Sequence, residues 1–134
     1  MLKQVIIFKG FWTFKDVQEN PTSLFIFGDN DISKGKGGQA VIRDEPNALG
    51  IPTKKLPNMH QNSFYQDSEL KDNKEKINIS IHKILKEVMK HNYKYIVFPE
   101  GGLGTGLSKL PEKAPLTYQY LDNKINALKV LFSN

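Results

Sequence analysis

A short apolar segment followed by a dense cluster of glycines constrains this chain more than any other feature. Residues 95–98, YIVF, are β-branched or aromatic, which is typical of a buried strand. Four glycines follow within six positions: Gly101, Gly102, Gly104 and Gly106. Glycine accepts positive φ and lets backbone N–H groups approach a ligand, so the pattern favours an anion-binding loop over a plain turn. Leu103 and Leu107, placed regularly among the glycines, support this interpretation, because a free linker needs no apolar anchors.

A second glycine-rich segment follows another apolar run. Residues 24–27, LFIF, have no polar interruption, as expected for a strand that is covered on both faces. Gly28–Asn30 and then the segment 33–38, SKGKGG, come next, and a short helix is expected over 39–43. Open α/β sheets place ligands at the carboxyl ends of their strands. Two glycine loops in this position therefore suggest that a diphosphate is held between them.

Further strands and helices complete an alternating pattern. Strands are expected at 5–8 and 48–53, and apolar side chains at three- and four-residue spacing predict helices over 72–92 and 115–128. An edge strand at 130–132 could follow. This alternation predicts the α/β class, as a three-layer α/β/α sandwich in a single domain, residues 1–134.

Aromatic and polar segments between these elements are less decisive. Phe11, Trp12 and Phe14 follow the first strand; Phe14 is expected to pack in the core. Phe11 and Trp12 either pack there too or offer a stacking face for a base, an interaction that contributes about 1–3 kcal/mol per base. The polar segment 56–68 is expected to be an exposed loop.

Composition limits the class of function. No apolar run approaches the roughly 20 residues that span a bilayer, and the absence of cysteine excludes disulfides and thiolate metal sites. A cytoplasmic protein without metal or cofactor is therefore expected. The formal charge of +5 favours an anionic partner, either a nucleotide or a nucleic acid.

The order of the motifs resembles a macro domain, the fold that binds ADP-ribose. The motifs are FGDN, GKGG, GIPTKK and IVFPEGGLGTGL, and the resemblance runs from about residue 5 to residue 128. It is closest to the glycohydrolases that remove ADP-ribose from DNA bases or acidic protein side chains, because Thr53–Lys54 and Phe98–Pro99 match that subgroup. The resemblance implies a mixed, mostly parallel sheet.

The resemblance also implies roles for individual residues. Asn30 would contact the distal ribose, and Lys54 would attack its anomeric carbon. The first glycine loop would line the distal ribose and diphosphate through Gly35, Lys36, Gly37 and Gly38. The second would wrap the diphosphate through Gly102, Leu103, Gly104, Thr105 and Gly106. The remaining expected ligand contacts are Phe11, Trp12, Asp29, Thr53, Leu107 and Ser108.

Two positions depart from the family pattern. Ser108 stands where the glycohydrolases carry an acid, and Gly10–Phe11 stands where macro domains carry Gly-Asp to read the adenine amine. Either adenine stacks on Phe11 or Trp12, or the ligand is not ordinary ADP-ribose. Lys54 is a nucleophile if its amine is neutral, and otherwise it pairs with a phosphate.

Three functions follow as hypotheses. The first is an ADP-ribosyl hydrolase acting on modified DNA or protein through Lys54. The second is a non-catalytic binder, which reads ADP-ribosylated targets or sequesters an NAD-derived signal such as a cyclic ADP-ribose. The third is a basic nucleic-acid-binding domain that does not use the cleft.

Overall fold

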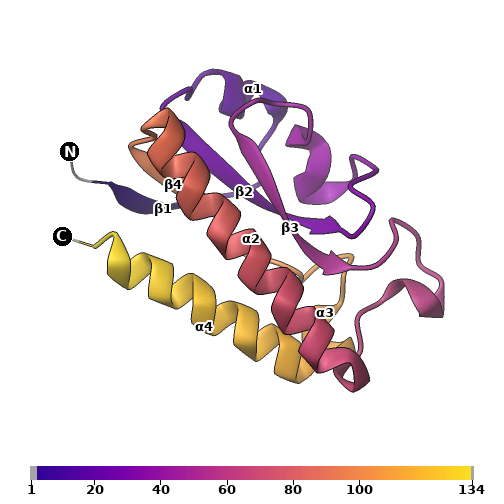
Figure 1. Cartoon of the computed structure of the whole chain (residues 1–134). Helices are drawn as coiled ribbons and strands as arrows, with labels where there is room; N and C mark the ends of the chain where they lie inside the picture. The colour runs from indigo at the N-terminus through magenta and orange to yellow at the C-terminus, as the bar shows by residue number, and fades with distance from the viewer. Residues whose placement is uncertain (1–2, 134) are drawn as a thin grey trace.

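A computed structural model describes residues 3–133 of the chain (Figure 1). Its sheet has four strands in the order β1-β4-β2-β3. The strands are β1 (Gln4–Phe8), β2 (Ser23–Asn30), β3 (Ala48–Lys54) and β4 (Tyr95–Pro99). Every neighbouring pair of these strands is parallel, so all four carboxyl ends lie along the same edge of the sheet. The expected strands are confirmed, and β2 extends three residues beyond the expected end at residue 27.

Helices cover both faces of the sheet and produce three layers. The long helices α2 (Leu70–His91) and α4 (Pro115–Leu131) pack on one face, where Leu24 and Ile26 of β2 are buried. The short helix α1 (Phe14–Gln18) and the 3₁₀ helix η1 (Gly38–Ile42) pack on the other. Phe25 and Phe27 alternate with Leu24 and Ile26 and point to that second face, since neighbouring side chains of a strand point in opposite directions.

The sequence-based expectations were wrong in two places at the level of the sheet. Within residues 3–133 the four strands are all parallel, so the mixed sheet implied by the resemblance is not observed. The edge strand expected at 130–132 is absent because α4 continues to Leu131. Leu121, Ile125 and Leu128 form a buried stripe along α4, and no proline or glycine interrupts the helix after them.

The segment 56–68 is also more structured than expected. It contains the 3₁₀ helix η2 (Gln61–Ser63) and the start of η3 (Asp67–Glu69), and Phe64 and Tyr65 are buried. The Tyr65 hydroxyl donates a hydrogen bond to the Asp31 carboxylate. Burial and this contact raise the pKa of Tyr65, which keeps the hydroxyl protonated as a donor. Two buried aromatic rings therefore anchor a stretch whose composition is otherwise that of a surface loop.

Replacing Leu121 with alanine tests the packing of α4 on the sheet. Leu121 is 1% exposed within the core, whereas Leu116 on the same helix is 53% exposed. We expect Leu121→Ala to lower the free energy of unfolding by about 2–5 kcal/mol, because the buried side chain would leave a cavity. The matched Leu116→Ala should stay within about 0.5 kcal/mol of the wild type. Urea unfolding measures both, and equal losses would contradict this placement of α4.

Candidate functional site

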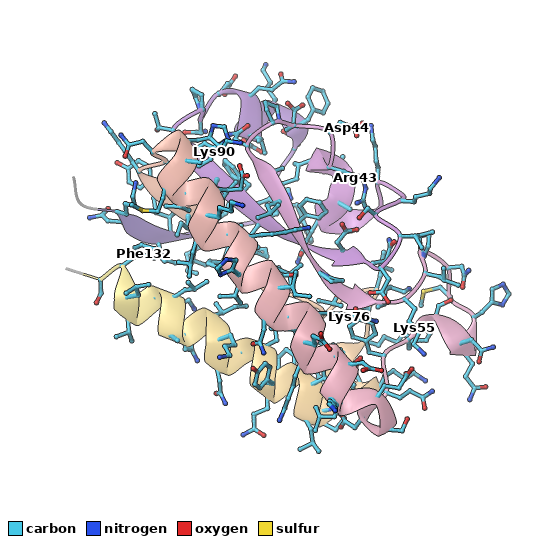
Figure 2. The ribbon with its side chains drawn as sticks, viewed as in Figure 1. Arg43, Asp44, Lys55, Lys76, Lys90 and Phe132 are labelled. Carbon is cyan, nitrogen blue, oxygen red and sulfur yellow. The ribbon has the colours of Figure 1, made fainter. Side chains whose placement is uncertain are left out.

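A cavity of about 810 Å³ lies across the carboxyl ends of the strands. Residues from both predicted glycine loops line it, together with residues that follow each of the four strands. Because β1 and β3 are the two edges of the sheet, residues 10–12 after β1 and Lys54 of β3 lie at opposite ends of the cavity. Three strand spacings separate these ends, a distance of about 14 Å. The end of the molecule that carries the cavity includes Arg43 and Lys55, whereas Lys90 and Phe132 lie at the other end (Figure 2).

The two glycine loops converge in the middle of this cavity. Leu107 Cδ1 lies 3.7 Å from the place that a Cβ at Gly37 would occupy, and 3.9 Å from the corresponding place at Gly38. Within the described residues, the backbone N–H groups of 35–37 and of 104–108 donate to no backbone carbonyl. Backbone N–H groups that are left without partners around a hollow are suited to bind the oxygens of an anion.

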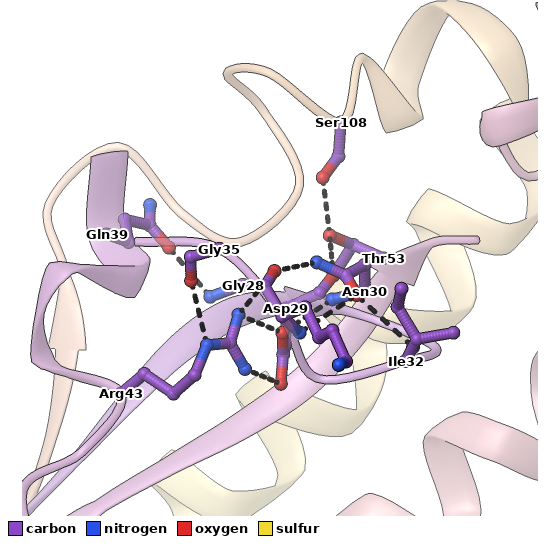
Figure 3. Close-up of polar contacts among 10 residues, drawn as sticks. Gly28, Asp29, Asn30, Ile32, Gly35, Gln39, Arg43, Thr53 and Ser108 are labelled. Carbon is purple, nitrogen blue, oxygen red and sulfur yellow. Dashed lines mark hydrogen bonds and ion pairs between the residues drawn. The ribbon is translucent and has the colours of Figure 1, made fainter. Parts of the chain in front are cut away.

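Gln39 connects the two loops directly. Its side-chain Oε1 accepts a hydrogen bond from the Gly28 N–H at 2.8 Å, and its Nε2 donates to the Gly102 carbonyl at 2.9 Å. The Gly28–Gln39 contact lies at the end of β2 (Figure 3). Sequence reasoning missed Gln39, although its place directly after two glycines was a signal that the residue adjoins the loop.

A largely buried ion pair holds the first glycine loop. Arg43 Nη1 and Nη2 donate to the two Asp29 carboxylate oxygens at 2.9 and 2.6 Å, and the two side chains are only 13% and 9% exposed (Figure 3). Arg43 also donates to the carbonyls of Gly35 and Lys34, at 2.8 and 3.1 Å. The Asp29 carboxylate lines the cavity, but its contacts position the loop and do not leave a free carboxylate for a ligand. Arg43 was not among the predicted site residues.

Asn30 is committed to the same loop. Its Nδ2 donates to the Lys34 carbonyl at 2.7 Å, and its Oδ1 accepts from the N–H groups of Ile32 and Lys34. The side chain lines the cavity and is mostly buried. Its contacts within the structure close the turn between β2 and the glycines, a use of asparagine that is common in turns.

Lys54 lies at the β3 end of the cavity and is 6% exposed. Its Nζ donates to the Asn58 carbonyl at 2.8 Å and lies 4.7 Å from the centre of the Phe64 ring. Burial lowers the pKa of Lys54, and the neighbouring Lys109 ammonium lowers it further. This environment increases the fraction of neutral amine, which is the form that can act as a nucleophile.

The aromatic residues after β1 have three different positions. Trp12 is buried, its Nε1 donates to the Gln39 carbonyl at 3.0 Å, and its ring packs edge-on against Phe8 and Phe25. Phe11 is fully exposed and lines the cavity. The expectation that Phe14 packs in the core was wrong: it is 54% exposed, because Trp12 and Val17 already fill that part of the core.

Three of the expected contacts lie behind the cavity wall. Leu103 is buried in the core between the sheet and the long helices, so its expected contact with a ligand is not observed in the lining of the cavity. Gly102 points its carbonyl at Gln39. The Thr53 hydroxyl is hydrogen-bonded to the Asp29 carbonyl at 3.2 Å and to the Ser108 hydroxyl at 2.7 Å, as Figure 3 shows. Ser108 itself lines the cavity, and so do the remaining predicted residues: Gly35, Lys36, Gly37, Gly38, Gly104, Thr105, Gly106 and Leu107.

Asp29 and Glu100 are the carboxylates that line the cavity in the described part of the chain. Glu100 follows β4; its Oε1 accepts a hydrogen bond from the Gly10 N–H at 3.1 Å, and its Oε2 lies 3.6 Å from Lys9 Nζ. In the sheet, β2 lies between β4, which Glu100 follows, and β3, which ends at Lys54. Glu100 and Lys54 therefore do not follow neighbouring strands. Lys34, Lys36, Arg43 and Lys54 also line the cavity, which gives it an excess of positive charge.

No helix within residues 3–133 is long and apolar enough to cross a membrane. No cluster of three or more histidine, cysteine, aspartate or glutamate side chains in the same residues could hold a metal ion.

The fold and site define an α/β protein with a cationic, glycine-lined cavity at the carboxyl edge of a parallel sheet. The chain belongs to a family of unknown function, DUF7831, whose model matches residues 7–124. No curated protein and no solved structure matches the chain.

Gly104 and Gly106 provide a matched test of the second loop. Gly104 has φ +77°, and a Cβ there would lie 3.0 Å from two Leu110 atoms, whereas a Cβ at Gly106 would have no heavy atom within 4 Å. We expect Gly104→Ala to lower the free energy of unfolding by about 1–3 kcal/mol, through backbone strain and crowding. Gly106→Ala should change it by no more than about 0.5 kcal/mol. Chemical denaturation compares them, and an undiminished stability of Gly104→Ala would contradict the loop geometry.

Proposed function

We propose that this protein binds ADP-ribose, or a closely related nucleotide derived from NAD, in the cavity at the strand ends. The unpaired N–H groups of 35–37 and 104–108, which come from two loops around one cavity, carry this proposal. A diphosphate is the part of such a ligand that needs many donors in a small space. The cavity volume also lies within the range of about 300–1,000 Å³ that is usual for small-molecule sites.

The order of the strands supports one direction for the ligand. Both glycine loops follow the central strands, β2 and β4, so the diphosphate would lie in the middle of the cavity. Phe11, fully exposed at the β1 end, would stack on the base, since Trp12 also lines the cavity but is only 6% exposed. The second ribose would then lie beside Lys54 at the β3 end. This placement is compatible with a binder of free nucleotide and with a reader of an ADP-ribosylated target.

Binding without turnover is the better supported form of the proposal. Removal of ADP-ribose from a target normally needs a group that protonates the leaving atom. Both carboxylates that line the cavity have partners: Asp29 is held by Arg43, and Glu100 interacts with Gly10 and Lys9. Ser108, beside Thr53, is a poor acid at neutral pH.

Phe11 and Phe14 offer a matched pair for the binding proposal. Phe11 lines the cavity, whereas Phe14 is exposed outside it, only three residues away. In isothermal titration calorimetry with ADP-ribose, Phe11→Ala should weaken binding by about 1–3 kcal/mol, roughly a 5- to 150-fold rise in Kd, because the base loses its stacking face. Phe14→Ala should bind like the wild type.

The same titration decides the proposal as a whole. No heat of binding at millimolar concentrations of ADP-ribose or of a cyclic ADP-ribose would refute it. Binding that both phenylalanine variants share with the wild type would leave the ligand in place but would refute its orientation.

A hydrolase that acts through Lys54 is the second candidate, and the buried, less basic amine favours it. The neutral amine would form a bond to the anomeric carbon of the second ribose as the bond to the target breaks, and the leaving group would take up a proton. Ring opening would give an imine, and water would then hydrolyse it to free ADP-ribose and the regenerated amine. Target DNA or protein would be released unmodified.

Chemical trapping distinguishes this mechanism from binding alone. Incubation with ADP-ribosylated DNA or protein in the presence of cyanoborohydride should add the mass of ADP-ribose less one oxygen atom to Lys54, because imine formation loses water and the reductant then adds two hydrogens to give a stable amine. Lys54→Met should lose both the adduct and the release of ADP-ribose, while Lys55→Met, which removes the partner of Glu69, should keep both. Release of ADP-ribose at the wild-type rate by Lys54→Met would exclude Lys54 as the nucleophile.

A further inference from the structure

Two hydroxyl groups form a short hydrogen-bonded chain from the surface of the cavity into its wall. The Thr53 hydroxyl lies 2.7 Å from the Ser108 hydroxyl and 3.2 Å from the Asp29 carbonyl oxygen (Figure 3). Thr53 belongs to β3 and is fully buried, whereas Ser108 lies shortly before the helix α3 (Leu110–Lys113), is partly exposed and lines the cavity. The chain therefore begins at the cavity and ends at a backbone carbonyl inside the sheet.

The carbonyl at the inner end fixes the direction of both hydroxyl protons. A carbonyl oxygen only accepts, so Thr53 donates its single hydroxyl proton to Asp29. Thr53 can then only accept in its contact with Ser108, and Ser108 must donate. Within residues 3–133, Ser108 Oγ has no other hydrogen-bond partner. The Ser108 proton is thus directed into the wall, and the oxygen offers lone pairs to the cavity.

This acceptor differs from the groups that surround it. The backbone N–H groups of 35–37 and 104–108 have no carbonyl partner within the described chain, and they are donors. They suit phosphate oxygens, which are acceptors. The same phosphate oxygens cannot bond to Ser108 Oγ, because lone pairs would then face lone pairs. The Ser108 oxygen needs a donor on the ligand, placed next to the phosphate-binding loops.

We propose that Ser108 is a specificity-determining residue whose oxygen accepts a hydrogen bond from a free hydroxyl on the sugar that follows the diphosphate. The inference rests on the proposed function and adds the chemical group that this part of the cavity selects. A sugar hydroxyl can donate, whereas an ester or ether oxygen in the same place cannot. The cavity therefore favours a second sugar that keeps this hydroxyl unsubstituted, and it disfavours one in which the hydroxyl is removed or joined to another group.

The exocyclic amine of the base is the other strong donor on such a ligand. With the base on Phe11 at the β1 end, this amine lies about 14 Å from the β3 end, across three strand spacings. It cannot then reach Ser108, which contacts Thr53 of β3. A ligand bound in the opposite direction would bring the amine to Ser108, and its affinity would not depend on the hydroxyls of the second sugar.

Titration with modified ligands tests the role of Ser108. The probes are ADP-ribose and three analogues, each of which lacks one hydroxyl of the second ribose, at C1, C2 or C3. We expect one analogue to bind the wild type about 2- to 12-fold more weakly than ADP-ribose, the usual net effect of one hydrogen bond. Ser108→Ala should bind ADP-ribose more weakly by a similar factor and should not distinguish that analogue from ADP-ribose.

Ser80→Ala is the matched control for this titration. The Ser80 hydroxyl also donates its proton inside the protein, to the Lys76 carbonyl at 2.9 Å, but the residue lies on α2 and is not part of the cavity lining. This variant should discriminate between ADP-ribose and the analogue by the wild-type factor.

Thr53→Val tests the direction of the hydrogen-bonded chain. Valine removes the acceptor that holds the Ser108 proton, so Ser108 can turn this proton toward the ligand. The probe is the analogue in which fluorine replaces the selected hydroxyl. The wild type should bind it more weakly than the analogue with hydrogen in that place, because two atoms with lone pairs would face each other. Thr53→Val should remove this difference, and circular dichroism checks that the variant is folded.

Three outcomes overturn the inference while binding of ADP-ribose persists. The first is a wild type that binds all three analogues as tightly as ADP-ribose. The second is a Ser108→Ala variant that still discriminates by the wild-type factor, since another group would then accept the hydroxyl. The third is a folded Thr53→Val variant that keeps the wild-type difference between the fluorine and hydrogen analogues. If the wild type does not bind ADP-ribose at all, the proposed function fails together with this inference, and titration of the unmodified ligand reports that separately.

Discussion

The ion pair between Asp29 and Arg43 fixes the part of the structure on which the site depends. Removing two charges from water is costly, so a buried pair by itself adds little stability. Here the guanidinium has further acceptors, the carbonyls of Gly35 and Lys34, and the pair therefore holds the loop together with the hydrogen bonds of Asn30. The bare backbone at Gly50 leaves room for it, because a Cβ there would lie 2.6 Å from Asp29 Oδ2. A loop held in advance loses less conformational freedom when a ligand binds.

Periodicity and glycine content were enough to predict most of the framework. The four strands, the two long helices and both glycine loops follow from local patterns, and these patterns placed the loops after strands whose ends lie together. The contacts that join the loops were not predictable in this way. Gln39 reaches the Gly102 carbonyl across 63 positions of sequence, and no local pattern contains that information. The same limit applies to Phe11 and Trp12, because their exposure depends on what else fills the core behind β1.

The sequence predicts where Lys54 lies but not the protonation behaviour of its amine. Its place at the end of β3 follows from the sequence, whereas its state depends on the burial of its amine and on Lys109. Those conditions lower the pKa of Lys54, while the carboxylates that line the cavity are engaged with other groups. A lysine amine can therefore become less basic in a site that still lacks a free carboxylic acid, the group that would protonate a leaving group.

The charged groups at the two ends of the cavity differ. At the β1 end, Glu100 interacts with the Gly10 N–H and Lys9, next to the exposed Phe11 ring. At the β3 end, Lys54 forms no salt bridge within the described part of the chain. The two ends of the cavity therefore differ in charge, because Phe11 and Glu100 lie at one end and Lys54 lies at the other. The strand order alone separates these two ends, so their separation is a property of the fold and not of any single side chain.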